Sequence, residues 1–175
     1  YGDAGDDSID GGDGNDIILG GEGNDTIDGG VGADDMAGGL GNDIYIVTSV
    51  NDMVNEAADE GVDEVRTNLA SYTLGAHVEN LTGIRSAGQT LIGNSLANRI
   101  TGTGSADILN GGGGADMMIG GAGDYLYYVN DAGDTIVEAN NGGNDTVNAS
   151  VSYSLVGIYV ESLALTGTAA INGSG

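Results

Sequence analysis

Apolar side chains recur at every ninth position near the start of the chain, and the positions between them are mostly glycine or polar. Residues 11–47 read GGDGNDIIL, GGEGNDTID, GGVGADDMA and GGLGNDIYIV, with glycine at positions one, two and four and aspartate at position six. A degenerate unit, GDAGDDSID, precedes them. The apolar residues at position eight are Ile18, Ile27, Met36 and Tyr45.

This period separates a turn from a short strand in each unit. Glycine at such density favours positive φ and tight bends, so GGxGxD predicts a turn. The residues after it suffice for one short strand with a single inward side chain. Two units then make one coil of eighteen residues, and coils with a fixed period stack. The predicted fold class is therefore all-β: a parallel β-roll, or flattened β-helix solenoid, with the position-eight side chains inside.

The position-six aspartates stack when the coils stack. Residues eighteen apart come to lie about 4.8 Å from one another, so one edge carries Asp7, Asp25 and Asp43, and the other carries Asp16 and Asp34. Two bare carboxylates at that distance repel by about 3 kcal/mol at an effective dielectric of about 20. The first 47 residues hold twelve acids and no Lys or Arg. Calcium, which takes roughly 6–8 oxygen ligands in flexible geometry, is predicted to resolve this repulsion better than magnesium.

The nonapeptides resemble the GGxGxDxUx repeats of RTX (hemolysin-type calcium-binding) proteins. The resemblance implies a secreted, extracellular bacterial protein that leaves the cell by type I secretion and folds on external calcium. It also implies that the position-six aspartates and carbonyl groups of the glycine turn bind the metal. The alternative, a disordered acidic linker, does not explain an apolar residue at every ninth position. Carried over to this sequence, the implied turn ligands are Gly12, Gly14, Gly21, Gly23, Gly30, Gly32, Gly39 and Gly41.

An internal duplication divides the chain into two tandem modules. GGLGNDIYIV from Gly38 corresponds to GGAGDYLYYV from Gly120, and GVDEV from Gly61 corresponds to GNDTV from Gly143. We expect four segments: a first roll at 1–47, a strand-rich continuation at 48–92, a degenerate second roll at 93–129 and a truncated second continuation at 130–175.

The aspartate at position six is not kept in every repeat of the second roll. This position holds Asn98, Asp107 and Asp116 and then Tyr125, with Asp124 one place early. Asparagine still offers an oxygen but no charge, so we expect fewer or weaker calcium sites here. Two candidates remain: Asn98 with Asp116, and Asp107 with Asp124. We expect several calcium ions in total, about three of them in the first roll.

Composition narrows the classes of partner. The formal net charge is −24, with 27 acidic residues against 3 basic ones, which argues against nucleic acid or an anionic membrane as a partner. No apolar run is long enough to span a bilayer, so we expect no membrane insertion. Without cysteine there are no disulfides or thiolate metal sites. Because the chain opens in mid-repeat, we expect a monomeric fragment of a larger chain.

The sequence predicts no enzyme. With His77 as the single histidine and no cysteine, HExxH zinc sites and Cys-His dyads are excluded. We expect a calcium-binding module that supports type I secretion and the stability of an attached domain. One alternative is a structural or adhesive repeat of a large surface exoprotein. Another is an accessory domain of a secreted polysaccharide-active or hydrolytic enzyme, for which carboxylate pairs are available among Glu56, Glu79, Glu138 and Glu161.

Overall fold

The computed structural model describes residues 1–168 and 170–175, and these residues form strands and turns without any helix. No segment of this described part could therefore cross a membrane as a helix. Residue 169, in the continuation predicted at 130–175, lies outside the described residues. The chain divides into two compact units: Tyr1–Leu69 with Leu74–Thr82, and Ala70–Thr73 with Gly83–Gly175.

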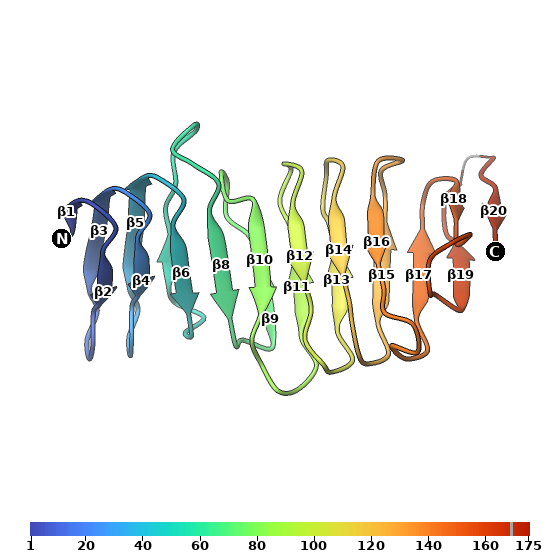
Figure 1. Cartoon of the computed structure of the whole chain (residues 1–175), viewed down its shortest axis with the longest axis horizontal. Helices are drawn as coiled ribbons and strands as arrows, with labels where there is room; N and C mark the ends of the chain where they lie inside the picture. The colour runs from blue at the N-terminus through green and yellow to red at the C-terminus, as the bar shows by residue number, and fades with distance from the viewer. Residues whose placement is uncertain (169) are drawn as a thin grey trace. The chain divides into compact units, whose positions relative to one another are not determined.

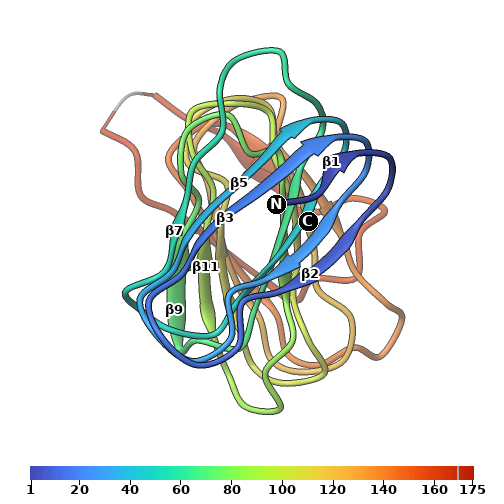
Figure 2. The ribbon, with the colours of Figure 1, turned by 90° about the vertical axis from the view of Figure 1, so that its left-hand side faces the viewer.

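In the first unit, strands of odd and even number belong to two different sheets. Strands β1, β3, β5 and β7 are neighbours in that order, and β2, β4, β6, β8 and β10 follow one another in the second sheet. Figure 2 shows β1, β3 and β5 lying one behind the other. The pairings from β1 to β7 in the first sheet and from β2 to β8 in the second are parallel. The strands are β1 (Asp3–Ala4), β2 (Ser8–Asp10), β3 (Ile17–Glu22), β4 (Thr26–Asp28), β5 (Asp35–Leu40), β6 (Ile44–Val47), β7 (Met53–Val54), β8 (Glu64–Thr67) and β10 (Asn80–Gly83).

The second unit repeats this alternation. Strands β9, β11, β13, β15, β17 and β19 are neighbours in one sheet, and β12, β14 and β16 in another, as Figure 1 shows along the chain. A short pair, β18 and β20, lies near the C-terminus. The strands are β9 (Ser71–Thr73), β11 (Thr90–Ile92), β12 (Arg99–Thr101), β13 (Ile108–Asn110), β14 (Met117–Ile119), β15 (Leu126–Val129), β16 (Thr135–Val137), β17 (Thr146–Ala149), β18 (Tyr153–Ser154), β19 (Ser162–Leu165) and β20 (Gly173–Ser174).

The register gives the length of each coil. Ile27 pairs with Tyr45 at the predicted spacing of eighteen residues, but Tyr45 pairs with Val65, twenty residues on. The same change occurs in the second unit, where Leu109 pairs with Tyr127 at eighteen residues. There the coil that follows β15 is again two residues longer. The two longer coils lie where the nonapeptide pattern is interrupted, and the extra residues widen the loop that leads into the next strand.

The position-eight side chains are the part of the core that the nonapeptide repeats contribute. In both units these residues are fully or almost fully buried, as the nine-residue period predicts. Residues on either side of them alternate toward solvent, as expected for strands with one buried face. The predicted fold class, an all-β parallel β-roll, is confirmed. The buried position-eight residues are Ile18, Ile27, Met36, Tyr45, Ile100, Leu109, Met118 and Tyr127.

Candidate metal centre

The position-six residue of each nonapeptide immediately precedes a strand, and its side chain links one coil to the coil before it. On the first edge of the first unit, the Asp7 amide donates to Asp25 Oδ1 at 2.8 Å and the Asp25 amide donates to Asp43 Oδ1 at 2.7 Å. The ladder continues with the Asp43 amide donating to Asp63 Oδ1 at 2.8 Å. The predicted alignment of Asp7, Asp25 and Asp43 along one edge is therefore present, and Asp63 extends it.

The other edge of the first unit is built in the same way. The Asp16 amide donates to Asp34 Oδ1 at 2.9 Å, and the Asp34 amide donates to Asp52 Oδ1 at 3.3 Å. Each ladder bond uses only one oxygen of a carboxylate. The second oxygen is left without a protein partner in most of these residues.

These second oxygens form the most unusual feature of the structure. We call them the open oxygens: carboxylate oxygens that are buried and accept no hydrogen bond from any described residue. A buried, unpaired carboxylate oxygen is costly, so a row of them indicates a ligand that supplies positive charge. The open oxygens are Oδ2 of Asp7, Asp16, Asp25, Asp34, Asp43, Asp63, Asp116 and Asp145, and Oε2 of Glu56.

Glycine at position one makes room beside six of the open oxygens, those of Asp7, Asp16, Asp25, Asp34, Asp43 and Asp116. A methyl group on Gly20 would lie 2.2 Å from Asp25 Oδ2 and 2.6 Å from the carbonyl oxygen of Gly38 in the next coil. A carboxylate oxygen and a backbone carbonyl oxygen thus face the same small space. Oxygen donors of these two kinds are the ligands that calcium prefers, so the residues present fit the ion that the repeat pattern predicts.

The position-one carbonyl groups were not among the predicted ligands, which came from positions two and four. Of those predicted glycines, Gly12 and Gly30 already use their carbonyl oxygens, which accept hydrogen bonds from the Val31 amide and the Thr48 hydroxyl respectively. The role of Gly14, Gly21, Gly23, Gly32, Gly39 and Gly41 in binding metal stays a prediction. Position one is glycine in all four repeats, but so are positions two and four, so the sequence pattern does not single it out.

In a second class of turn, the aspartate carboxylate accepts hydrogen bonds from residues of the same turn. Asp107 Oδ2 accepts hydrogen bonds from the Thr103 amide at 2.7 Å and the Thr103 hydroxyl at 2.9 Å, while its Oδ1 accepts one from the Gln89 amide. Asp52 and Asp134 are capped in the same way by amides of their own turns. These turns lack the GG pair, and their backbone amides take the place that a cation would otherwise fill.

The two candidate sites of the second roll differ in the structure. The Asn98 amide donates to Asp116 Oδ1 at 2.8 Å, so this pair is brought together, and Asp116 has an open oxygen. Burial is the main cause that raises the pKa of Asp116. The second pair, Asp107 with Asp124, stays a prediction. Asp124 is exposed, and its Oδ1 accepts a hydrogen bond from the Asn144 amide.

Tyr125 stands at position six beside this second pair. It occupies position six directly after Asp107 in the stack, is 2% exposed, and donates its hydroxyl proton to the carbonyl oxygen of Thr103. Its ring stacks on Tyr127 with ring centroids 5.7 Å apart. A phenol therefore fills the space where other turns present an open oxygen, and burial raises its pKa far above the usual range.

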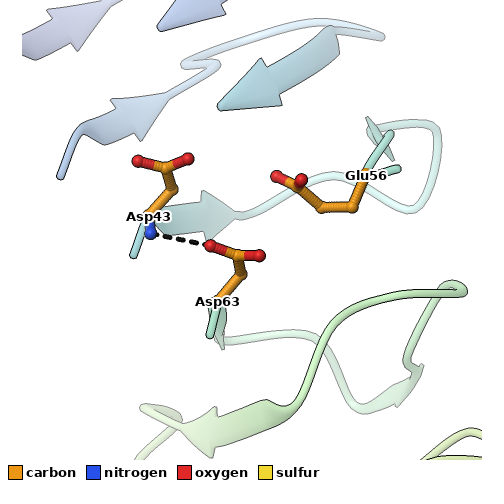
Figure 3. A group of neighbouring side chains, drawn as sticks. All are labelled: Asp43, Glu56 and Asp63. Carbon is orange, nitrogen blue, oxygen red and sulfur yellow. Dashed lines mark hydrogen bonds between the residues drawn. The ribbon is translucent and has the colours of Figure 1, made fainter. Parts of the chain in front are cut away.

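Three carboxylates converge at the end of the first edge. Asp43, Glu56 and Asp63 each place one oxygen within 4.8 Å of the others, and Figure 3 shows Glu56 reaching toward the two aspartates. The Tyr45 hydroxyl donates to Glu56 Oε1 and fixes this side chain. Burial, followed by the charges of Asp63, Asp43 and Glu60, raises the pKa of Glu56 to about 8. Burial also raises the pKa of Asp63 to about 6 and that of Asp43 above its ordinary value.

Asp63, Asp145 and Glu56 were missed as site residues. For the two aspartates a signal existed, because GVDEV and GNDTV keep glycine, aspartate and an apolar residue at positions four, six and eight of the repeat. Glu56 had no comparable signal. It follows the short strand β7, in a coil that is two residues longer than the coil before it in the same sheet.

A comparison with protein families agrees with this geometry. The model of the RTX calcium-binding nonapeptide repeat (4 copies) matches residues 1–27, 11–45 and 92–126. A comparison with curated proteins gives no match. The matched repeat is a structural, calcium-binding element and not a catalytic family. Glu56, Asp63 and Asp145 lie outside the matched residues. The chain therefore contains RTX calcium-binding nonapeptide repeats, and these repeats build a parallel β-roll.

Proposed function

We propose that this chain is a calcium-dependent folding module of a secreted bacterial protein. In this proposal the module passes through a type I secretion system with little structure. Outside the cell it folds on calcium and stabilises the domain attached to it. It acts as a monomeric part of a larger chain.

The observation that carries the proposal is the row of open oxygens in consecutive coils. Asp25, Asp43 and Asp63 stack on one edge, and each leaves a buried oxygen without a partner. Glycine also loses more backbone entropy on folding than any other residue, and 35 of the 175 residues are glycine. We infer that the coils near these aspartates do not persist without a cation, so that the free energy of metal binding becomes free energy of folding.

The expected affinity suits export. Extracellular calcium modules bind at about 10⁻⁴–10⁻³ M, which would leave the chain loose in a calcium-poor cytosol and ordered outside. Calcium at roughly ten times the dissociation constant stabilises the fold by about 1.4 kcal/mol per site, so three sites along the first roll contribute about 4 kcal/mol.

A calcium titration followed by circular dichroism tests the proposal. We expect a cooperative gain of strand signal with a midpoint between about 10⁻⁴ and 10⁻³ M calcium, reversed by a chelator. Magnesium at the same concentration and sodium chloride at matched ionic strength are the controls, and neither should produce the transition. A fold that forms equally well in chelator, or a midpoint at micromolar calcium or below, would contradict the proposal.

A further inference from the structure

The cluster of Asp43, Glu56 and Asp63 differs from the other candidate sites because it includes a side chain from outside the nonapeptide repeats. Each of its three members has an open oxygen, and Asp43 and Asp63 are each only 1% exposed. Oxygens from all three lie within 4.8 Å of one another. The arrangement is therefore a convergence of three buried, unpaired acceptors and not a solvated acidic patch.

The local chain geometry holds this arrangement in place. The Asp43 amide donates to Asp63 Oδ1, as Figure 3 shows, which fixes the two aspartates relative to each other. Tyr45, which itself accepts a hydrogen bond from the Gly38 amide, donates to Glu56 Oε1. Glu56 Oε2 is thereby left as the open oxygen.

We propose that Asp43, Glu56 and Asp63 bind one calcium ion of their own, a mixed site that closes the first roll. The inference rests on the proposed calcium-dependent function and adds a site beyond the nonapeptide repeats. The ion pair recorded among the described residues joins Arg66 to Glu64 and involves none of these three carboxylates.

The spacing and the charge both favour calcium. Calcium–oxygen distances are about 2.3–2.6 Å, so ligands on opposite sides of the ion lie up to about 5 Å apart, whereas magnesium would require about 4 Å. Three carboxylates bring more charge than the one or two available elsewhere on the edge, and the number of charged ligands raises calcium affinity. We therefore expect this site to fill at a lower calcium concentration than its neighbours.

The second unit contains a natural counterpart without the site. Glu138 and Asp145 correspond to Glu56 and Asp63, and the Tyr127 hydroxyl donates to Glu138 Oε1 as that of Tyr45 does to Glu56. Tyr125 replaces Asp43, however. Glu138 Oε2 instead accepts hydrogen bonds from the Ala139 amide at 2.9 Å and the Gly121 amide at 3.3 Å. This carboxylate is satisfied by the backbone and has no open oxygen.

Counting bound calcium in matched variants tests the inference. Equilibrium dialysis of the full chain at saturating calcium, with folding verified by circular dichroism, should show one ion fewer in Glu56→Gln than in the unaltered protein. The control Glu138→Gln should bind as many ions as the unaltered protein. An unchanged count in folded Glu56→Gln would overturn the proposed site while leaving calcium-dependent folding intact. An unaltered protein that binds no calcium would instead overturn the proposed function.

The reciprocal variant covers the case in which Glu56→Gln does not fold. Tyr125→Asp supplies the carboxylate that the second unit lacks, next to Glu138 and Asp145. We expect it to bind one calcium ion more than the unaltered protein, a gain that misfolding cannot produce. A folded Tyr125→Asp protein with an unchanged count would contradict the proposal that a third carboxylate creates the site.

Discussion

The twenty-residue coils that follow β6 and β15 occupy corresponding places in the two units and differ in how they treat buried charge. In the first, Asp43 joins Glu56 and Asp63, and all three keep an open oxygen. In the second, Tyr125 stands in place of that first aspartate, and its hydroxyl donates to a backbone carbonyl. The comparison shows that the position of Asp43 can be filled either by an unpaired carboxylate that favours a cation or by a phenol that needs none.

The same division runs through the ordinary eighteen-residue coils. Turns that begin with GG leave an open oxygen on Asp25 or Asp34, whereas the turn before Asp107 caps its carboxylate with Thr103. A backbone amide and a cation are thus alternative partners for the same oxygen. Dependence on calcium should follow the open oxygens and not the number of acidic residues.

The largest expected effects separate these two kinds of aspartate. Asp107→Asn places an amide group opposite the Thr103 donors, so the free energy of unfolding should fall by about 1–3 kcal/mol at every calcium concentration. Asp43→Asn should instead reduce the dependence on calcium, by about 1.4 kcal/mol for each tenfold rise in calcium above the dissociation constant. Urea unfolding at two saturating calcium concentrations measures both quantities. Equal losses of calcium dependence in the two variants would remove the distinction.

A smaller contrast is expected between the two buried tyrosines beside the glutamates. Tyr45→Phe leaves the Gly38 amide without its acceptor and Glu56 without its donor, which should cost about 1–2 kcal/mol. Tyr127→Phe should cost about 1 kcal/mol or less, because Glu138 keeps two backbone donors. Thermal unfolding of both variants in saturating calcium gives the comparison. A larger loss in Tyr127→Phe would contradict it.

The pH dependence should be weaker and confined to the calcium-free protein. The pKa of Glu56 rises from 4.5 to about 8, so the folded state binds more protons than the unfolded chain between these values. The free energy of unfolding should therefore fall as pH rises from about 4.5 to 8. The pKa of Glu56 is raised by its burial and by the negative charges of Asp63, Asp43 and Glu60. The Tyr45 hydroxyl donates a hydrogen bond to the same carboxylate.

Circular dichroism in chelator at pH 5 and pH 8 measures this effect. We expect more strand signal at pH 5, and a weaker dependence on pH in Glu56→Gln. Asp63, with its pKa raised to about 6, contributes in the same direction at the acidic end of the window. Strand signal that increased with pH would contradict the predicted fall of the free energy of unfolding.

The smallest effect is expected at Asp124. This exposed residue accepts a hydrogen bond from the Asn144 amide and has no open oxygen, so Asp124→Asn should change the free energy of unfolding by less than about 0.5 kcal/mol. Asp116→Asn, its matched partner in the second roll, should lower the number of bound calcium ions. Isothermal titration calorimetry distinguishes the two, and a loss of calcium in Asp124→Asn would restore the pairing with Asp107 that the sequence predicts.

Periodicity was sufficient to predict the fold and the stacking of aspartates. The spacing of Ile18, Ile27 and Met36 gave the inward face, and the eighteen-residue coil placed Asp25 beside Asp43. Such inferences succeed because each repeat contacts only its neighbours. The spacing of residues along the sequence therefore determines which side chains meet in the folded protein.

The rest of the site depends on structural features that the nine-residue period does not predict. Glu56 reaches the edge through a change in coil length, and its partner Asp63 belongs to an incomplete repeat. The capping of Asp107 depends on whether an amide in its own turn points at the carboxylate. Motif spacing identifies an acidic side chain, but only the turn geometry decides whether its second oxygen remains open.

Anomalous diffraction from crystals grown with calcium would test the central claim most directly. The account predicts calcium peaks beside the open oxygens of Asp25 and Asp34 and one peak shared by Asp43, Glu56 and Asp63. It predicts none at Asp107 or at Tyr125. Open oxygens without ions, or a calcium ion bound to the capped carboxylate of Asp107, would contradict it.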